Sequence, residues 1–151
     1  MEQICRKLYF HLMKTLLLLI VLLPFISCAQ QKGDNQIILH DHISFNKLKS
    51  TLFNNGYTLI NSDSNYITTY PTSISKSSIT LKMMILRTDT SVSFKGYYKS
   101  NDERNFEGMI LKDDFALLQF NGSKRGDLKI TWHEMDRIAK LLSGDISYGK
   151  Q

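Results

Sequence analysis

The stretch "SITLKMMILRTDTSVSFKGYYK", residues 78–99, decides how this chain folds. Its first part alternates with a period of two, which is typical of a β-strand with one buried face. One phase holds Ile79, Leu81, Met83 and Ile85, and the other holds Thr80, Lys82, Met84 and Leu86. After a turn at residues 88–90, the second part places Val92, Phe94 and Tyr98 in one phase. We therefore predict two strands joined by this turn.

Shorter strand patterns lie on both sides of this stretch. The segments "YTLI" at 57–60 and "NYITTY" at 65–70 flank the turn-forming residues 62–64 and predict a hairpin. Pro71 is expected to end the second strand of this hairpin or to place that strand at an edge of the sheet. "NFEGMIL" at 105–111 and "FALLQF" at 115–120 follow, and residues 37–39 predict a brief strand or a docking segment. The total is about five or six short strands in an antiparallel meander.

A first helix is predicted from residue 45 onward. Ser44 is a good N-cap, and Ile43 before it can pack on Leu48. Apolar residues then recur at helical spacing, at Phe45, Leu48, Leu52 and Phe53. Residues 54–56, Asn-Asn-Gly, supply the stop, since Gly56 accepts a left-handed conformation.

A second helix is predicted near the end of the chain. Thr131 and Glu134 have the spacing of a capping box, which places the N-cap at Thr131. The apolar stripe that follows consists of Trp132, Met135, Ile138, Ala139 and Leu142. We expect Trp132 to anchor the core and Gly144 to end the helix.

The order helix, antiparallel strands, helix predicts an α+β domain with two layers. Each helix has one apolar stripe and the sheet has one apolar face, so both helices are expected to pack on that face. We assign residues 37–151 to this single domain. The arrangement is loosely similar to the small domains of outer-membrane assembly lipoproteins and to helix-grip folds.

The N-terminal segment has the features of a secretory signal. Residues 16–26 are almost purely apolar but fewer than the roughly 20 that span a bilayer, and Lys14 supplies a basic flank. We expect residues 1–27 to form the signal peptide. Met13 opens a complete signal peptide by itself, so we expect it to be the true start.

The end of that segment, Phe25-Ile26-Ser27-Cys28, resembles the lipobox of bacterial lipoproteins. The resemblance implies cleavage before Cys28 and lipidation of its thiol, although Phe25 stands where the family prefers leucine. Ser27 and Ala29 also fit a small-x-small cleavage pattern, which would release a soluble, cysteine-free protein. Cys5 lies in the removed segment, so neither alternative allows an intramolecular disulfide.

Residues 28–36 are expected to form a lipidated N-terminus and a short polar tether. The stretch 31–34, Gln-Lys-Gly-Asp, looks like the signal of surface lipoproteins in the Bacteroidetes group, with Gly33 as a departure. The resemblance implies a cell-envelope location, with the outer membrane favoured and its periplasmic or surface face left open. The alternative to a lipid-anchored protein is a soluble protein that is secreted or periplasmic.

The composition excludes some classes of protein. The chain has 151 residues, 42% of them hydrophobic, and two prolines, which indicates one globular domain rather than a disordered chain. Its net charge is +5, of which two charges belong to the first 28 residues. This mild excess predicts no nucleic-acid partner, because nucleic-acid binding usually requires a strongly basic face.

Two groups of residues are candidate binding sites. Tyr66, Tyr70 and Tyr97 would form an aromatic patch if they face away from the helices, although the strand preference of tyrosine also explains them. Lys124 and Arg125, near Lys129, form a small basic loop that suits phosphate or anionic lipopolysaccharide, or is simply solvated.

Other motifs carry less weight. Residues 40–42, His-Asp-His, fall short of a zinc site, so no metal or cofactor is expected. The acidic pairs at 102–103 and 113–114 lie in predicted turns, as do the tripeptides at 121–123 and 125–127. We find no phosphate-binding glycine loop, nucleophile elbow or cysteine–histidine pair, so we expect no catalytic residues and no enzyme.

The sequence therefore predicts a non-enzymatic envelope lipoprotein, held in the membrane by its lipid, whose domain binds an envelope protein or polymer. One alternative is a small-ligand carrier with a cavity lined by Met83, Met84 and Met109. Another is an inhibitor or immunity-type protein that binds a secreted enzyme.

Overall fold

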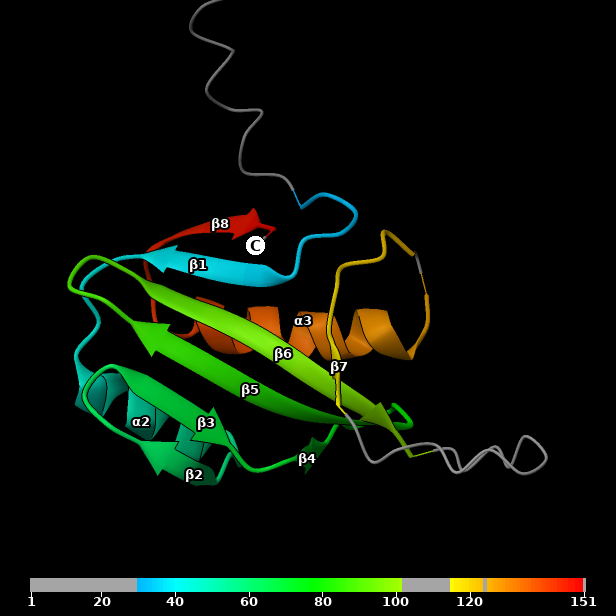
Figure 1. The fold of residues 1–151 in the computed structure, drawn as a ribbon, viewed down its shortest axis with the longest axis horizontal. Coiled ribbons are helices and arrows are strands. Elements are labelled where there is room, and N and C mark those ends of the chain that lie inside the picture. Colours follow the sequence, from blue (N-terminus) through cyan, green and yellow to red (C-terminus); the bar gives the residue numbers. More distant parts are fainter. Residues whose placement is uncertain (1–29, 102–114, 124, 151) are drawn as a thin grey trace, which may run out of the picture.

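A computed structural model describes residues 30–101, 115–123 and 125–150 of the chain. The predicted α+β class is confirmed: the described residues form an antiparallel sheet and two helices (Figure 1). The strands are β1 Gln36–His40, β2 Leu59–Ser62, β3 Tyr66–Thr69, β4 Thr72–Ser73, β5 Ile79–Arg87, β6 Val92–Ser100, β7 Ala116–Leu117 and β8 Asp145–Gly149. The helices are α2 Phe45–Asn54 and α3 Asp127–Lys140.

The predicted central hairpin is confirmed as β5 and β6, which pair from Ile79 opposite Ser100 to Arg87 opposite Val92. The order of neighbouring strands in the sheet is β2-β3-β5-β6-β1-β8, so a meander is present only from β2 to β6. The described sheet has eight strands instead of five or six, since β4 pairs with β5 and β7 with β6 outside this path. The strand expected at 105–111 lies outside the described residues.

Strand β3 ends at Thr69, just before Pro71, as predicted, but pairing with β5 resumes in β4, after the proline. β3 pairs with the second half of β5, and β4 pairs with Leu81 and Thr80 in its first half. At the break the hydroxyl of Thr69 accepts a hydrogen bond from the backbone N–H of Met83, at 2.9 Å. A side-chain hydroxyl thus accepts the Met83 N–H where the backbone ladder between β3 and β5 is interrupted.

The first and last strands of the described chain form the other edge of the sheet. β1 pairs with β6 on one side and with β8 on the other. Strand β8 is not among the predicted strands, because the last predicted feature of the chain is the helix stop at Gly144. That glycine lies after the helix has ended, at φ +128°, where a Cβ would approach Asp41 and Leu39 to 2.9 Å. It allows the tight turn into β8.

Helix α2 begins and ends where the sequence predicts. The Ser44 hydroxyl accepts a hydrogen bond from the backbone N–H of Lys47, and the helix ends at Asn54. Gly56 follows with φ +84°. Local capping signals are therefore sufficient to define this helix.

The predicted N-cap of helix α3, Thr131, is wrong by five residues, because the observed N-cap is Gly126. The helix begins at Asp127, and the Gly126 carbonyl accepts hydrogen bonds from the N–H groups of Lys129 and Ile130. Thr131 lies inside the helix, where its hydroxyl donates to the Asp127 carbonyl at 2.8 Å. The Asp127 carboxylate accepts bonds from the Ser78 N–H and hydroxyl, at 3.0 and 2.6 Å. This contact with a distant turn stabilises an earlier helix start than the local pattern indicates.

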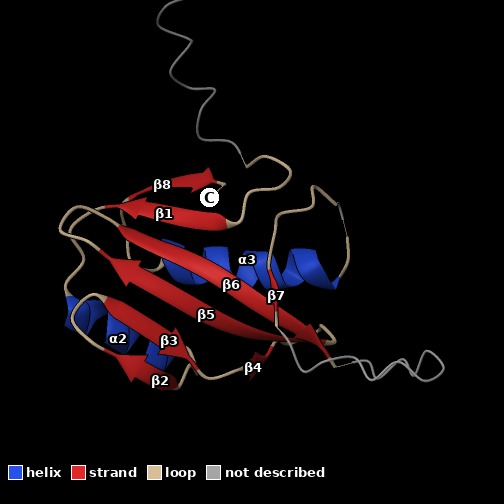
Figure 2. Ribbon diagram, in the orientation of Figure 1, coloured by secondary structure: helices blue, strands red, loops and turns tan. Residues whose placement is uncertain are grey.

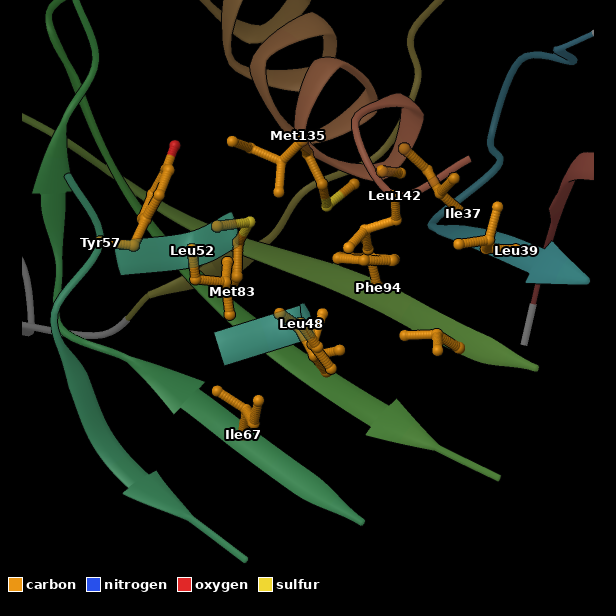
Figure 3. Packing of buried hydrophobic residues seen from close by; sticks show 14 of the residues in the cluster. Ile37, Leu39, Leu48, Leu52, Tyr57, Ile67, Met83, Phe94, Met135 and Leu142 are labelled. Carbon is orange, nitrogen blue, oxygen red and sulfur yellow. The ribbon is translucent and has the colours of Figure 1, made fainter. Parts of the chain in front are cut away.

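Both helices cover the same face of the sheet, behind the strands in the view of Figure 2. The core lies between the helices and the sheet. It includes Phe94 and Met83 from the sheet and Leu48 and Met135 from the helices (Figure 3). Trp132 is completely buried, as predicted, with its ring centroid 5.8 Å from that of Phe120. Met83 and Met84 point to opposite faces of β5, so these two methionines do not line one cavity.

The polar segment before β1 packs on the domain. Gly33 donates a backbone hydrogen bond to the Phe120 carbonyl, and Phe120 donates one to the Asp34 carbonyl, both at 2.7 Å. Asp34 and Asn35 are buried. The chain is therefore held against the domain from Gly33 onward.

Candidate functional site

The face of the sheet opposite the helices, which we call the open face, carries the second phase of the central hairpin (Figure 2). Its residues on these two strands are Thr80, Lys82, Met84 and Leu86 on β5, and Ser93, Lys95, Tyr97 and Lys99 on β6. None of these eight residues is acidic, and Lys82 and Lys95 lie in the middle of the hairpin, so this part of the open face carries positive charge.

The strand register places these lysines close together. Lys82 lies opposite Tyr97, and Lys95 lies opposite Met84. Lys82 and Lys95 are therefore diagonal neighbours, with backbones roughly 7–8 Å apart. Like charges at this spacing repel each other, and an anion bound between them would remove that cost.

A shallow cleft of about 170 Å³ lies beside them on the open face. Its walls consist of Gln36, Tyr66, Met84, Leu86, Ser93 and Lys95. The cleft combines an aromatic ring, two apolar side chains and a cation. We call the surface formed by the following side chains the open-face patch: Tyr66, Lys82, Met84, Leu86, Lys95 and Tyr97.

The structure places two of the predicted binding residues on the open face but does not bring them together, because Tyr66 pairs with Leu86, four positions along β5 from Lys82. Tyr66 lines the cleft, and Tyr97 lies on the same face opposite Lys82. Tyr70 is 51% exposed but follows the end of β3 and does not line the cleft. Arg125 is exposed just before α3, a helix that packs on the other face. Lys124 lies outside the described residues.

A larger pocket lies on the helix side of the sheet, between α3, the end of α2 and the segment that contains β4. Its volume is about 570 Å³. We call it the Tyr57 pocket, and its lining residues are Asn55, Tyr57, Thr72, Ser73, Ile74, Ser75, Ile130, His133, Glu134 and Arg137.

A hydrogen-bonded network forms the wall of this pocket. Arg137 binds both carboxylate oxygens of Glu134, through Nε at 2.8 Å and Nη2 at 2.7 Å. The Tyr57 hydroxyl donates to the same carboxylate at 3.0 Å, and Arg137 Nη1 donates to Asn55 Oδ1 at 2.9 Å. The network therefore joins α3 to the chain at the end of α2.

The network shifts two ionisation equilibria. The hydrogen bonds from Arg137, together with the Tyr57 hydroxyl, lower the pKa of Glu134 below its ordinary value despite partial burial. Burial, followed by the nearby Glu134 charge, raises the pKa of Tyr57 well above its ordinary value. At neutral pH Glu134 is therefore ionised and Tyr57 is protonated.

The segment 40–42 does not converge on one point. His40 Nε2 is 2.7 Å from the hydroxyl of Ser147 on β8, whereas Asp41 accepts a hydrogen bond from the backbone N–H of His42. Within the described part of the chain, no group of three or more histidine, cysteine or acidic side chains is arranged to hold a metal ion. The acidic pairs at 102–103 and 113–114 and Met109 lie outside it.

Sequence reasoning missed both the lysines of the open face and the Tyr57 pocket. The alternation of residues 78–99 contained the first signal, because it puts Lys82 and Lys95 in the phase opposite the buried one. No comparable signal exists for the pocket, since Tyr57 and Glu134 are 77 residues apart.

Comparison of the chain with protein-family models, with curated proteins and with solved structures finds no match. Neither helix among the described residues has the length and apolar character needed to cross a bilayer. Cys28 and the remainder of the expected signal lie outside the described residues. The open-face patch and the Tyr57 pocket are therefore the features of this chain that bear on its function.

Proposed function

We propose that this chain is a non-enzymatic lipoprotein of the cell envelope, anchored through Cys28, whose open-face patch binds an anionic envelope polymer. The observation that carries this proposal is the pair Lys82 and Lys95 on the helix-free face of β5 and β6, beside Tyr97 and Met84 and with no acidic residue on either strand.

Charge complementarity favours a polyanion over an uncharged surface as the partner. Lys82 and Lys95 repel each other across the two central strands, and a polymer with repeated negative groups would bridge them. Tyr66 and Leu86 offer apolar contact beside Lys95, which suits the carbon skeleton of a polysaccharide better than bare ions. An acidic envelope protein is the competing partner, and the experiment below separates the two.

The length of the tether is consistent with a partner at the membrane surface. The domain begins to pack at Gly33, five residues after Cys28. Five extended residues span at most about 17 Å. A lipid on Cys28 would therefore keep the domain close to the bilayer, where anionic headgroups and attached glycans are concentrated.

Catalysis is not part of the proposal. The hydrogen bond between His40 and Ser147 lies on exposed strand positions, and neither residue lines the cleft or the Tyr57 pocket. A histidine–serine pair needs an enclosed site with donors for a developing oxyanion before it accelerates acyl transfer.

Binding to dextran sulfate, with uncharged dextran as the reference polymer, tests the proposal. We expect dextran sulfate alone to bind, with an affinity that falls as salt is added. Replacement of both lysines (K82A/K95A) should weaken binding about tenfold. The matched control K49A/R125A removes two positive charges from other surfaces and should retain affinity. Equal loss in both double variants, or no binding to dextran sulfate, would reject the open-face assignment.

The anchor and the class of partner need separate measurements. Intact mass spectrometry of the mature protein should show a chain beginning at Cys28 with added diacylglyceryl and acyl mass. A chain beginning at Gln30 without added mass would reject the anchor. Cross-linking from the open face in intact cells should recover polymer; recovery of one acidic protein instead would replace the polymer as the partner.

A further inference from the structure

The Tyr57 pocket has the size of a small-molecule site and lies on the opposite side of the sheet from the open-face patch. Its volume of about 570 Å³ falls within the range of roughly 300–1,000 Å³ that is common for ligand pockets. The pocket takes its residues from three separate parts of the chain, at residues 55–57, 72–75 and 130–137. Its walls are therefore positioned by the tertiary fold.

The charges in this pocket compensate each other. Both oxygens of Glu134 are occupied by Arg137, and one of them also accepts the Tyr57 hydroxyl. The ion pair contributes no net charge, and neither partner is left to attract a counterion. An uncharged ligand is favoured, because the ion pair has no net charge to compensate a charged ligand for the hydration it loses on binding.

The same pocket is also lined by polar side chains that have no hydrogen-bond partner among the described residues. The side chains of Ser73, Ser75 and His133 make no hydrogen bond to any described residue. A hydroxyl both donates and accepts, an imidazole has two ring nitrogens, and the Arg137 guanidinium has five N–H groups, of which three bond to Glu134 and Asn55. A ligand that satisfies these groups must present closely spaced donors and acceptors, as adjacent hydroxyls do.

Two apolar side chains complete the lining. Ile74 and Ile130 belong to the same pocket and offer a non-polar surface beside the hydroxyls. A sugar ring has this dual character, since its C–H groups form an apolar face and its hydroxyls point outward from the ring. We propose that the Tyr57 pocket is a binding site for an uncharged sugar, separate from the polyanion site on the open face.

The test uses three sugars with one ring shape and different charges: N-acetylglucosamine, which is neutral, glucosamine, which is cationic, and glucuronate, which is anionic. Amide NMR titration of the full mature chain should show saturable shifts at residues 72–75 and 130–137 with N-acetylglucosamine. Glucose, galactose and mannose extend the neutral series. The charged sugars should bind more weakly than their neutral counterparts.

Two single substitutions at exposed residues make the test specific. Ser73→Ala and His133→Ala should each weaken sugar binding about three- to tenfold, as expected for the loss of one hydrogen bond. Both residues are exposed, so the variants should fold, which the NMR spectrum itself verifies. The K82A/K95A variant should bind sugar as the unaltered protein does, which separates this site from the proposed function.

Three results would overturn the assignment. The first is the absence of saturable shifts with every neutral sugar. The second is tighter binding of glucuronate or glucosamine than of N-acetylglucosamine. The third is a set of shifts confined to β5 and β6 on the open face. None of these results depends on whether the open-face patch binds a polyanion.

Discussion

The hydroxyl of Tyr57 donates a 3.0 Å hydrogen bond to Glu134 Oε1, although the two residues are 77 positions apart in the chain. The ring of Tyr57 is buried in the core, and its hydroxyl reaches helix α3 (Figure 3). This one contact links the packing of the core to the wall of the larger pocket.

Tyr57→Phe should lower the free energy of unfolding by about 1 kcal/mol, because it removes a partly buried hydrogen bond to a carboxylate and keeps the ring. Urea denaturation measures the change. Tyr70→Phe is the matched control: Tyr70 is half exposed and should tolerate the same substitution within about 0.5 kcal/mol. Equal effects in the two variants would contradict a structural role for the Tyr57 hydroxyl.

Alkaline conditions should destabilise the fold through Tyr148. Its hydroxyl donates to Asp136 at 2.9 Å, and burial, then that carboxylate, raises its pKa from 10.0 to about 12. The unfolded chain therefore loses this proton first, so stability is complete below pH 10 and falls as the pH rises toward 12.

Urea denaturation at several pH values on both sides of 10 measures this slope. In Tyr148→Phe the decline should be shallower, because one of the tyrosines with a raised pKa is absent and Tyr57 remains. An unchanged slope in this variant would show that Tyr148 does not contribute.

The start of helix α3 gives a prediction that separates the observed cap from the one suggested by the sequence. Asp127→Ala should destabilise the protein more than Thr131→Val does, since Asp127 joins the first turn of the helix to Ser78. Thr131 has no capping role, and valine retains its shape in the buried helix interior. Thermal unfolding compares the variants. A larger effect of Thr131→Val would restore the capping box at Thr131.

Gly96 should resist enlargement because another side chain occupies the space beside it. A Cβ at this position would lie 2.8 Å from Leu118 Cδ2 and 3.2 Å from Leu81 Cδ1. Gly96→Ala should therefore cost about 1–3 kcal/mol. Ser93→Ala, on the open face of the same strand, is the control and should change stability little.

A double-mutant cycle tests the cause of that cost. In a Leu118→Ala background the methyl group of alanine at position 96 has room, so the penalty of Gly96→Ala should shrink. An unchanged penalty would indicate that backbone conformation, rather than contact with Leu118, disfavours alanine at this position.

Local patterns were sufficient for the elements whose stability depends on near neighbours. Helix α2 has its hydroxyl cap at Ser44 and its glycine at Gly56, and both act within a few residues of the helix. The β5–β6 hairpin is defined by its alternation and its short turn. Tyr66 and Tyr97 were identified as candidate binding residues for the same reason, because strand periodicity assigns each residue to a face.

Local patterns failed where a distant contact competes with them. The capping box at Thr131 is a valid local signal, but Ser78 holds Asp127 and the helix begins there. Strand β8 has a weak pattern of its own and exists because β1 provides an edge on which it can pair. The Tyr57 pocket arises in the same way, from three segments that the fold brings together.

The amino-acid sequence alone determined the class of fold, the faces of the central strands and the expectation of a lipid anchor, since periodicity, caps and cleavage motifs act over a few residues. Only the tertiary structure decided the order of the strands, the start of α3, the spacing of Lys82 and Lys95, and the pairing of Tyr57 with Glu134. The physical reason is that these features depend on burial and hydrogen bonds between segments far apart in the chain, whose relative positions no local pattern encodes.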